Sequence, residues 1–470
     1  MIDGLRPYPE MKASGLPWLG DVPAHWNILR SKRLLKATET PVRPDDEIVT
    51  CFRDGQVTLR KNRRSSGFMI ALLEQGYQGV RAGQLVVHSM DAFAGAIGVS
   101  DSDGKCTPEY IVCEPRSDSA VPRYYSWVLR QAARTGYILA SCPAVRERAP
   151  RLRYPDLGEL RVPVPSADEQ RLIVRLLEWH GAQTANLVRA KKKLIALLNE
   201  QKQAIIHRAV TRGPDRNAKL QPSGIPWLGD VPEGWEVKPL KHWAGINRRT
   251  LSQNTDPDYI FDYIDISAVG TGDLASPPLR MRFEASPSRA RRIVRQGDTL
   301  ISTVRTYLRA IYHVDRPWPD LIASTGFAVL TPAPSVDARF FGFVLQGKTF
   351  VDQVVANSIG VAYPAISEPR LGSLHICLPS SWQVQERIIS LLQTATIDFD
   401  KSIATIQREI ALIQEFRTRL IADVVTGKLD VRAAAASLPA VTEPEPVDDL
   451  AEGDNLDEAI DAAENEEVAA

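Results

Sequence analysis

Apolar residues recur in alternating steps of four and three along two long segments that contain no proline, residues 168–211 and 388–420. This is the spacing of a coiled-coil seam, in which one stripe of a helix faces another helix. A helix of 44 residues would be about 66 Å long. The predicted apolar seam positions are Ile173, Leu177, Leu187, Leu194, Leu198 and Ile205 on the first helix and Ile388, Leu392, Phe399, Ile406, Ile413 and Leu420 on the second.

Polar residues interrupt both predicted stripes, as Lys191 does on the first helix. Such residues lower stability but can fix the register of a helix pair. The alternative is two ordinary amphipathic helices on separate cores, but neither segment carries an apolar face broad enough for that. We therefore predict that the two helices pair in antiparallel fashion, with Ile173 beside Leu420 and Leu194 beside Phe399.

The chain contains an internal repeat that includes these helices. Residues 14–23 and 223–232 read SGLPWLGDVP and SGIPWLGDVP, nine identities in ten positions at a separation of 209 residues. Residues 83–89 correspond to 297–303 at a separation of 214, and the helical stripes match at 215. A repeat of this length indicates the duplication of one unit, made of an opening segment, a globular domain and a long helix.

The segments between these landmarks read as mixed and rich in strands. A turn glycine precedes an apolar run in both VRAGQLVVHS and VRQGDTLISTV, while EYIVCEP and GFAVLTP end at proline. We expect an α+β fold in which two strand-rich domains are separated by an antiparallel pair of long coiled-coil helices, with pseudo-twofold duplication. The expected segments are a first globular domain (1–165), a central long helix (166–213), a linker with the second globular domain (214–379), a distal long helix (380–430) and an acidic, disordered tail (431–470).

The net charge of zero hides an uneven distribution. Residues 439–470 carry twelve acidic and no basic side chains, so residues 1–438 hold all 57 basic and the other 45 acidic residues, a net charge of +12. A basic body suits a polyanion such as DNA, although solubility alone would also explain it. Five scattered cysteines favour a reducing compartment, and no apolar run is long enough to cross a membrane, so we expect a cytoplasmic protein.

Basic and polar residues gather in segments predicted to be loops. Arginine can hold a guanine edge with two hydrogen bonds or meet a phosphate, and for each arginine taken singly a solvated surface position is the alternative. Because the two halves share a scaffold but differ in these loops, we expect them to perform one task on two different targets. The candidate DNA-binding residues are Arg60, Lys61, Arg63, Arg64, Arg146 and Arg148 in the first half and Arg248, Arg249, Arg291, Arg292, Arg305, Tyr307, Arg309, Asn357 and Ser358 in the second.

Motifs for catalysis are missing from the sequence. It has no P-loop, no GxGxxG turn after a strand and no Asn-Pro-Pro-aromatic box of the kind that a DNA amino-methyltransferase needs. Asp256, Asp258, Asp262 and Asp265 lie close together in sequence, as a metal site would require, but a solvated loop and strand edge explains them as well. We predict neither a catalytic residue nor a metal site.

The repeated motifs resemble those of the specificity subunit of type I restriction-modification systems. They are the repeated decapeptide, the G-[DQ]-x-[LV]-[IV]-x-[ST] strand, the proline followed by Gln-Arg or Gln-Glu-Arg that opens each long helix, and the Val-Thr pair that closes it. The resemblance covers about residues 10–430. The acidic tail after Arg432 lies outside the family pattern, and the start of the second helix is one residue longer than that of the first.

The resemblance implies two target-recognition domains, each reading one half of a split sequence in double-stranded DNA, joined by helices that set the spacer. It also implies a chain without catalysis or cofactor. Two modification subunits that bind S-adenosylmethionine would dock along the helices, motor-nuclease subunits would complete the restriction enzyme, and no membrane is involved. Two alternatives remain: a self-sufficient DNA methyltransferase or nuclease, which the missing motifs disfavour, and a duplicated scaffold that binds only proteins.

Overall fold

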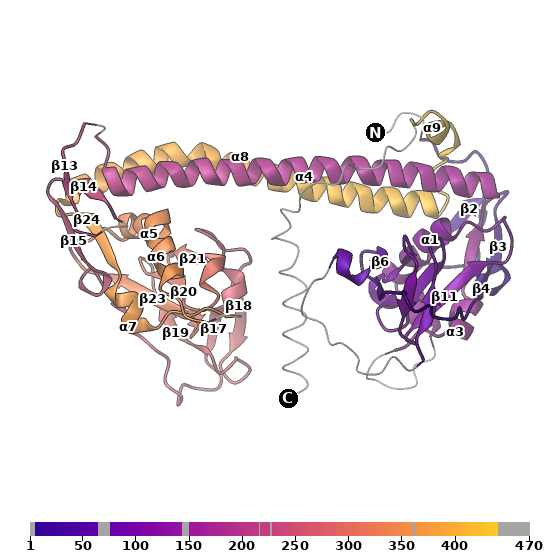
Figure 1. Ribbon diagram of the computed structural model, residues 1–470, viewed down its shortest axis with the longest axis horizontal. Helices are drawn as coiled ribbons and strands as arrows, with labels where there is room; N and C mark the ends of the chain where they lie inside the picture. Colours follow the sequence, from indigo (N-terminus) through magenta and orange to yellow (C-terminus); the bar gives the residue numbers. More distant parts are fainter. Residues whose placement is uncertain are drawn as a thin grey trace. The chain divides into compact units, whose positions relative to one another are not determined.

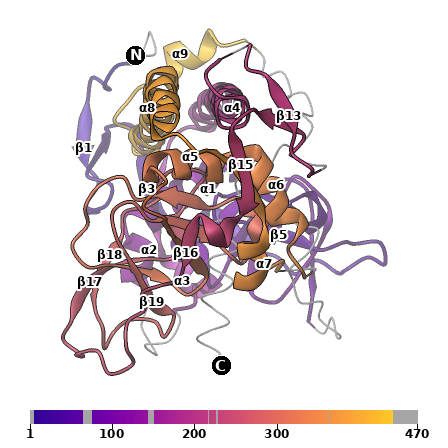
Figure 2. The same ribbon diagram turned by 90° about the vertical axis from the view of Figure 1, so that its left-hand side faces the viewer.

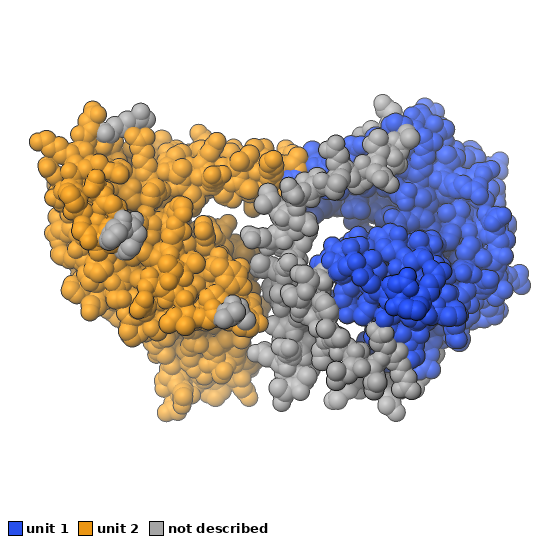
Figure 3. Space-filling model, viewed as in Figure 1, with its two compact units in different colours: residues 1–189, 410–470 blue, residues 190–409 orange. Residues whose placement is uncertain are grey.

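The computed structural model describes residues 5–63, 76–142, 150–215, 217–225, 228–360 and 363–439. The chain divides into two compact units, residues 1–189 with 410–470 and residues 190–409 (Figure 3). Each unit therefore combines a globular part with one portion of each long helix.

A four-stranded antiparallel sheet, in the order β4-β11-β8-β9, forms the centre of the first unit. Side chains alternate between its faces: Leu85 and Val87 pack beneath helix α1, while Val86 packs on the opposite face against the β5-β6 hairpin. The described strands of this unit are β1 (Met11–Ala13), β2 (Asp21–Pro23), β3 (Asn27–Arg30), β4 (Leu35–Ala37), β5 (Val49–Cys51), β6 (Val57–Leu59), β7 (Gln78–Val80), β8 (Leu85–His88), β9 (Ile97–Val99), β10 (Gly104–Cys106), β11 (Tyr110–Pro115) and β12 (Arg161–Val164), and its short helices are α1 (Pro122–Arg134), α2 (Tyr137–Ser141) and α3 (Tyr154–Glu159).

The second unit has an equivalent sheet, in the order β16-β23-β20-β21. Ile301 and Leu330 pack beneath α5 and α6, and Leu300 and Val329 on the other face pack against an additional sheet, β18-β17-β22-β19. The described strands are β13 (Leu220–Pro222), β14 (Asp230–Pro232), β15 (Trp235–Pro239), β16 (Ala244–Ile246), β17 (Ile260–Ile264), β18 (Leu279–Arg282), β19 (Ala290–Val294), β20 (Thr299–Ser302), β21 (Ile311–His313), β22 (Leu321–Ser324), β23 (Phe327–Pro332) and β24 (His375–Pro379), and the short helices are α5 (Ala338–Gln346), α6 (Lys348–Ala356) and α7 (Glu368–Ser373).

The repeat in the sequence is a repeat in topology. The hairpin β1-β2 corresponds to β13-β14, and the antiparallel pair β3-β12 corresponds to β15-β24, which leads into the second long helix. The α+β class with internal duplication is therefore confirmed. The sheet built from β17, β18, β19 and β22 corresponds in the first unit to the β5-β6 hairpin and the β7-β10 pair, which a parallel bridge between Ile48 and Lys105 joins.

The two long helices, α4 (Ala167–Arg212) and α8 (Trp382–Val425), lie side by side (Figures 1 and 2). In the second unit, Lys191 Nζ lies 2.6 Å from Glu409 Oε2 and Lys202 Nζ lies 2.5 Å from Asp400 Oδ1. Residue numbers rise along α4 as they fall along α8, so the helices are antiparallel, as predicted. No helix within the described residues combines the length and the apolar character needed to cross a membrane.

The register of the pair differs from the predicted one by about one heptad. With Leu194 beside Phe399, Asp400 would lie nine positions, or about 14 Å, from the residue facing Lys202. The side chains could not bridge that distance, and Leu198 instead lines one groove with Ser402. The apolar spacing repeats every seven residues, so a shift of one heptad preserves the pattern and the sequence cannot exclude it.

The seam on α4 also departs from the prediction. Leu187 and Leu194 are each 46% exposed and so lie outside the buried seam, whereas Val188 and Ile195, one residue further along, are half-buried. Both members of each neighbouring pair are apolar, so the sequence offers two stripes on adjacent sides of the helix. Packing against α8 selects the one that contains Val188 and Ile195.

The remaining predicted seam residues are buried or half-buried. Near the ends of the helices they join the cores of the globular parts: Ile173, Leu177 and Leu420 in the first unit, Ile388 and Leu392 in the second. Ile406 is buried in the helix pair itself. The half-buried positions are Leu198, Ile205, Phe399 and Ile413.

The end of α8 is fastened to the beginning of the chain within the first unit. The backbone amide of Asp430 donates to the carbonyl of Arg6 at 2.7 Å. Gly427 has a φ of +77° and approaches Trp26 and Pro23 so closely that an added Cβ would collide with Pro23. The first unit is therefore assembled from both ends of the chain.

Candidate nucleic-acid interface

Two loops of the second unit meet at the end of the central sheet. One follows β20 and contains the short 3₁₀ helix η6 (Thr306–Leu308), and the other follows α6. The hydroxyl groups of Thr306 and Ser358 lie 2.7 Å apart, and the Arg305 guanidinium lies 4.7 Å from the centre of the Tyr363 ring. The structure thus brings together Arg305, Tyr307, Arg309, Asn357 and Ser358, which the sequence placed in two separate loops.

The backbone of this loop pair is held in an ordered but strained form. Arg305 and Arg309 have φ values of +50° and +54°, in the left-handed region that side chains with a Cβ rarely occupy. Reciprocal backbone hydrogen bonds of 2.8 and 2.9 Å join Ile359 and Ala365. Asn357 Oδ1 accepts from Arg370 Nε at 3.0 Å. Such conformations persist where surrounding contacts impose them, and they are common at binding sites.

The side chains that project from the loop pair are aromatic, apolar and cationic. Tyr307, Ile359 and Tyr363 are 51%, 81% and 64% exposed, and Arg309 is exposed beside them, 3.8 Å from Asp352. Arginine can contact phosphates or base edges, and tyrosine and isoleucine can contact base edges and thymine methyl groups. Ile359 was not among the sequence candidates; an isoleucine next to a glycine inside a predicted loop was the available signal.

The other predicted basic group of the second unit includes a residue that is engaged internally. Arg249 Nη2 lies 2.6 Å from the buried carboxylate of Asp298 and 3.1 Å from the Thr331 hydroxyl, so it ties β16 to the sheet. Arg291 lies over the Phe283 ring at 4.8 Å. The remaining two, Arg248 and Arg292, are exposed and half-buried respectively.

The carboxylates that resembled a metal site are used for ion pairs instead. Asp258 pairs with Arg282, Asp262 with Arg280 and Asp265 with Arg289, at distances of 3.2, 3.5 and 3.0 Å. Within the described residues, no group of three or more His, Cys, Asp or Glu side chains is arranged to hold a metal ion.

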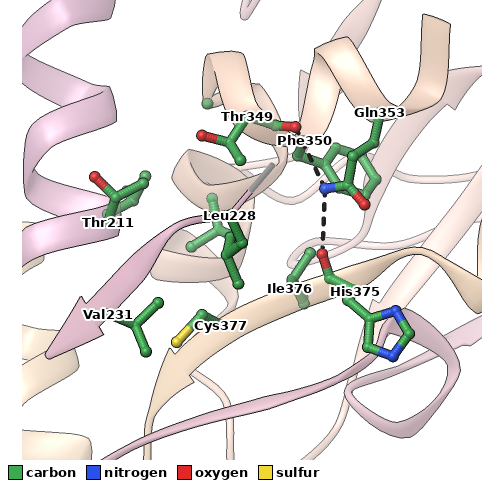
Figure 4. Close-up of a pocket in the computed structure, with 12 residues that line it drawn as sticks. Thr211, Leu228, Val231, Thr349, Phe350, Gln353, His375, Ile376 and Cys377 are labelled. Atoms are coloured by element: carbon green, nitrogen blue, oxygen red, sulfur yellow. Dashed lines mark hydrogen bonds between the residues drawn. The ribbon is translucent and has the colours of Figure 1, made fainter. Parts of the chain in front are cut away.

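The pocket between α6 and β24 is too small for a substrate (Figure 4). Its volume is about 20 Å³, space for roughly one water molecule. Gln353 Nε2 spans one wall by donating to the carbonyls of Thr349 and His375 at 3.3 and 3.2 Å. The walls are otherwise mainly apolar, with Val210, Leu228, Val231, Phe350, Ile376 and Cys377 among them.

Comparison with known proteins gives relatives of one kind. The type I restriction enzyme MjaVIII specificity subunit of Methanocaldococcus jannaschii is 22% identical over 58% of this chain and 63% of its own length. The type I restriction enzyme HindI specificity subunit of Haemophilus influenzae is 23% identical over 33% of this chain and 35% of its own length. A solved structure on complex assembly and conformational transition of the type I R-M system contains a chain with the same fold, with a TM-score of 0.58 at 16% identity over 87% of this chain and 99% of that one. In sequence the chain is similar to type I specificity subunits, and in fold it is similar to the chain of that solved structure.

The matches to the two named relatives each span less than two thirds of the relative's length. No protein-family model matches the chain. The similarity therefore consists of partial sequence matches to these relatives together with a fold shared over 87% of this chain.

The predicted basic residues of the first unit that the structure describes have partners within that unit. Lys61 Nζ lies 2.5 Å from Glu47, and Arg63 lies 2.7 Å from Asp54 and stacks on Phe52. Arg60 Nε donates to the Thr50 hydroxyl at 3.2 Å. The other three candidates of this half, Arg64, Arg146 and Arg148, lie outside the described residues.

Proposed function

We propose that this chain is the DNA-recognition subunit of a type I restriction-modification complex, with each globular part contacting one half of a split DNA sequence. The observation that supports it best is the duplicated scaffold, in which matching sheets lead into antiparallel helices but carry different loops. Two copies with different contact surfaces suit a target with two different halves.

In this proposal the loop pair of the second unit enters a groove of the duplex. Arg309 and neighbouring cations contact phosphates and fix the position of the domain, while the exposed Tyr307 and Ile359 reach base edges. The contacts that hold Arg305 and Ser358 order the loops before DNA arrives, so less conformational entropy is lost on binding.

The helices would set the number of unread base pairs between the two halves. Each residue adds about 1.5 Å along a helix and each base pair about 3.4 Å along a duplex. Inserting four residues at matching positions of α4 and α8 should therefore lengthen the preferred spacer by roughly two base pairs.

Catalysis would belong to other subunits. Modification subunits would bind S-adenosylmethionine and methylate the DNA, and motor-nuclease subunits would cut it. A surface for such partners is available on the helices, where Leu187, Leu194 and Leu197 of α4 and Leu412 and Phe416 of α8 are exposed. The same surface supports the second candidate, a duplicated scaffold that binds proteins alone.

Methylation mapping of host DNA with and without this gene tests the proposal. We expect a set of methylated sites that share two short motifs at a fixed separation and that disappear when the gene is deleted. A variant with the paired four-residue insertion should shift that separation. An unchanged methylome after deletion, together with no salt-sensitive binding of the chain to duplex DNA, would favour the protein scaffold instead.

A further inference from the structure

A broad cleft lies inside the first unit, where α1 meets the neighbouring portions of α4 and α8. Its volume is about 800 Å³, in the range of small-molecule sites. Arg130 and Arg134 reach it from α1 and Arg417 from α8, and the Trp127 ring forms part of the wall. None of these residues is among the candidate DNA contacts described above.

No acidic side chain of the described residues lies within ion-pair distance of the three guanidinium groups of this cleft. In the described part of the chain, Arg130, Arg134 and Arg417 form no ion pair and no hydrogen bond, and Arg130 Nε is both shielded from solvent and without a partner. Burial is the largest influence on Arg130 and lowers its pKa; the nearby Asp54 carboxylate raises it, and the charges of Arg417 and Arg134 lower it by less. A largely buried cation without an ion pair is costly, and a bound anion would reduce that cost.

The acidic residues at the cleft are already largely neutralised. Glu178 accepts from Arg123 at 2.9 Å, and Asp54 accepts from Arg63 at 2.7 Å. Asp101 also lines the cleft and accepts from the Ser102 hydroxyl. After these pairings, three guanidinium groups face one carboxylate, so the cleft has an excess of positive charge.

The duplicated half shows that the fold does not require this charge. In the matching motifs of α1 and α5, Tyr-Tyr-Ser-Trp-Val-Leu-Arg and Phe-Phe-Gly-Phe-Val-Leu-Gln, Gln346 stands where the first half has Arg130. The second unit forms the equivalent helix with a neutral amide at this position. Packing alone therefore does not account for Arg130.

We propose that this cleft binds a phosphate group, presented by a free nucleotide-like molecule or by the backbone of DNA. A phosphate offers several acceptor oxygens and a negative charge, one on a phosphodiester and close to two on a terminal phosphate, which match guanidinium groups that approach from α1 and α8. The Trp127 ring, 5.3 Å from the Arg130 guanidinium carbon, supplies a flat apolar wall for the ring of the molecule that carries the phosphate.

The test is calorimetric titration of the full-length chain with inorganic phosphate, with adenosine monophosphate and with a 20-base-pair duplex of arbitrary sequence. Arg130→Gln, which copies the second half, and Arg417→Gln, on the helix surface, should each weaken binding of the responsible probe at least about tenfold. Arg171→Gln is the matched control, because Arg171 lies on α4, pairs with Asp168 and carries the same charge. It should leave binding unchanged.

The three probes separate the two sources of phosphate. Binding of phosphate or the nucleotide that depends on Arg130 and Arg417 assigns the cleft to a free ligand. If the Arg130 and Arg417 variants lose binding only to the duplex, and that binding depends less steeply on salt, the cleft is assigned to the DNA backbone. If Arg417→Gln, with the melting temperature of the wild type, binds all three probes as the wild type does, the proposal is wrong. The outcome is independent of whether the chain recognises a split DNA sequence.

Discussion

Gln170 and Gln385 make the same set of hydrogen bonds in the two halves of the chain. The Gln170 side chain accepts from the Val121 amide at 2.9 Å and donates to the carbonyls of Ser119 and Pro165, each at 3.0 Å. Gln385 accepts from the amide of Asp337 at 2.8 Å and donates to the two corresponding carbonyls. Both are buried, so one carboxamide joins each long helix to the domain before it.

Replacing either glutamine by alanine should therefore destabilise its own unit. Each substitution leaves buried backbone groups without partners, and we expect a loss of about 2–3 kcal/mol in the free energy of unfolding. Urea denaturation followed by circular dichroism measures it. Gln201→Ala, at an exposed position of α4, is the control and should change stability by less than about 0.5 kcal/mol. Equal effects at Gln170 and Gln201 would contradict the assigned role.

Neighbouring residues of α4 should respond differently to the same change. Ile195→Asp places a charge in the half-buried seam, whereas Leu194→Asp places it on an exposed side of the same helix. We expect the first to cost about 2 kcal/mol and the second little. The comparison cancels helix propensity, since both variants gain the same residue. A larger loss of stability for Leu194→Asp than for Ile195→Asp would mean that the seam runs through Leu194, as predicted from the sequence.

The register of the helix pair can be tested by disulfide crosslinking. Leu198 and Ser402 line one groove, so a double cysteine variant, Leu198→Cys with Ser402→Cys, should oxidise readily. In the alternative register Leu198 would face Ala395, and the variant Leu198→Cys with Ala395→Cys should remain reduced. Non-reducing electrophoresis of a limited proteolytic digest distinguishes the two, and crosslinking of the second pair alone would overturn the observed register.

Substitutions of Arg309 and Arg249 should have different effects, the first on DNA binding and the second on stability. Arg309 is exposed, so Arg309→Gln should weaken DNA binding across sequences and reduce the salt slope by about one, with unchanged stability. Arg249→Gln leaves the buried Asp298 carboxylate without its ion pair. Because Arg249 is 26% exposed, solvent weakens this ion pair, and we expect the free energy of unfolding to fall by about 2 kcal/mol. Titrations of a duplex at several salt concentrations and thermal unfolding give the two readouts.

Mild acid should destabilise the second unit through His313. Burial lowers the pKa of His313, which lies 3.1 Å from the Thr299 hydroxyl. The unfolded chain therefore binds a proton at a higher pH than the folded chain, so stability is full above about pH 6.5 and declines as the pH falls below it. His313→Gln should flatten that part of the pH profile of unfolding. An unchanged profile would mean that His313 does not contribute.

The sequence was sufficient for the features that a repeat or a period determines. The duplication, the α+β class, the two long helices and their antiparallel direction were all predicted. The register was not, because a shift of seven residues preserves the apolar pattern. Leu187 and Leu194 were wrongly predicted to lie in the seam because the next residues, Val188 and Ile195, are also apolar and the sequence does not show which of each pair is buried.

The candidate interface was predictable only in part. The loop that carries Arg305 was found because it follows a predicted strand, and the loop that carries Ser358 because it lies between corresponding elements of the two halves. Their contact, between Thr306 and Ser358, joins residues 52 positions apart in the chain. Arg249 shows the converse. Nothing in its sequence neighbourhood reveals Asp298, which lies 49 positions away and accepts its hydrogen bond.

The hydrogen bond between Asp430 and Arg6 has a consequence for biosynthesis. The second unit is one uninterrupted stretch, residues 190–409, so a ribosome has polymerised all of it before the last third of α8 is made. The first unit, although translated earlier, lacks Leu420, Val424 and Val431 of its core until then. Nascent chains should therefore reach protease resistance in the reverse of their order of translation.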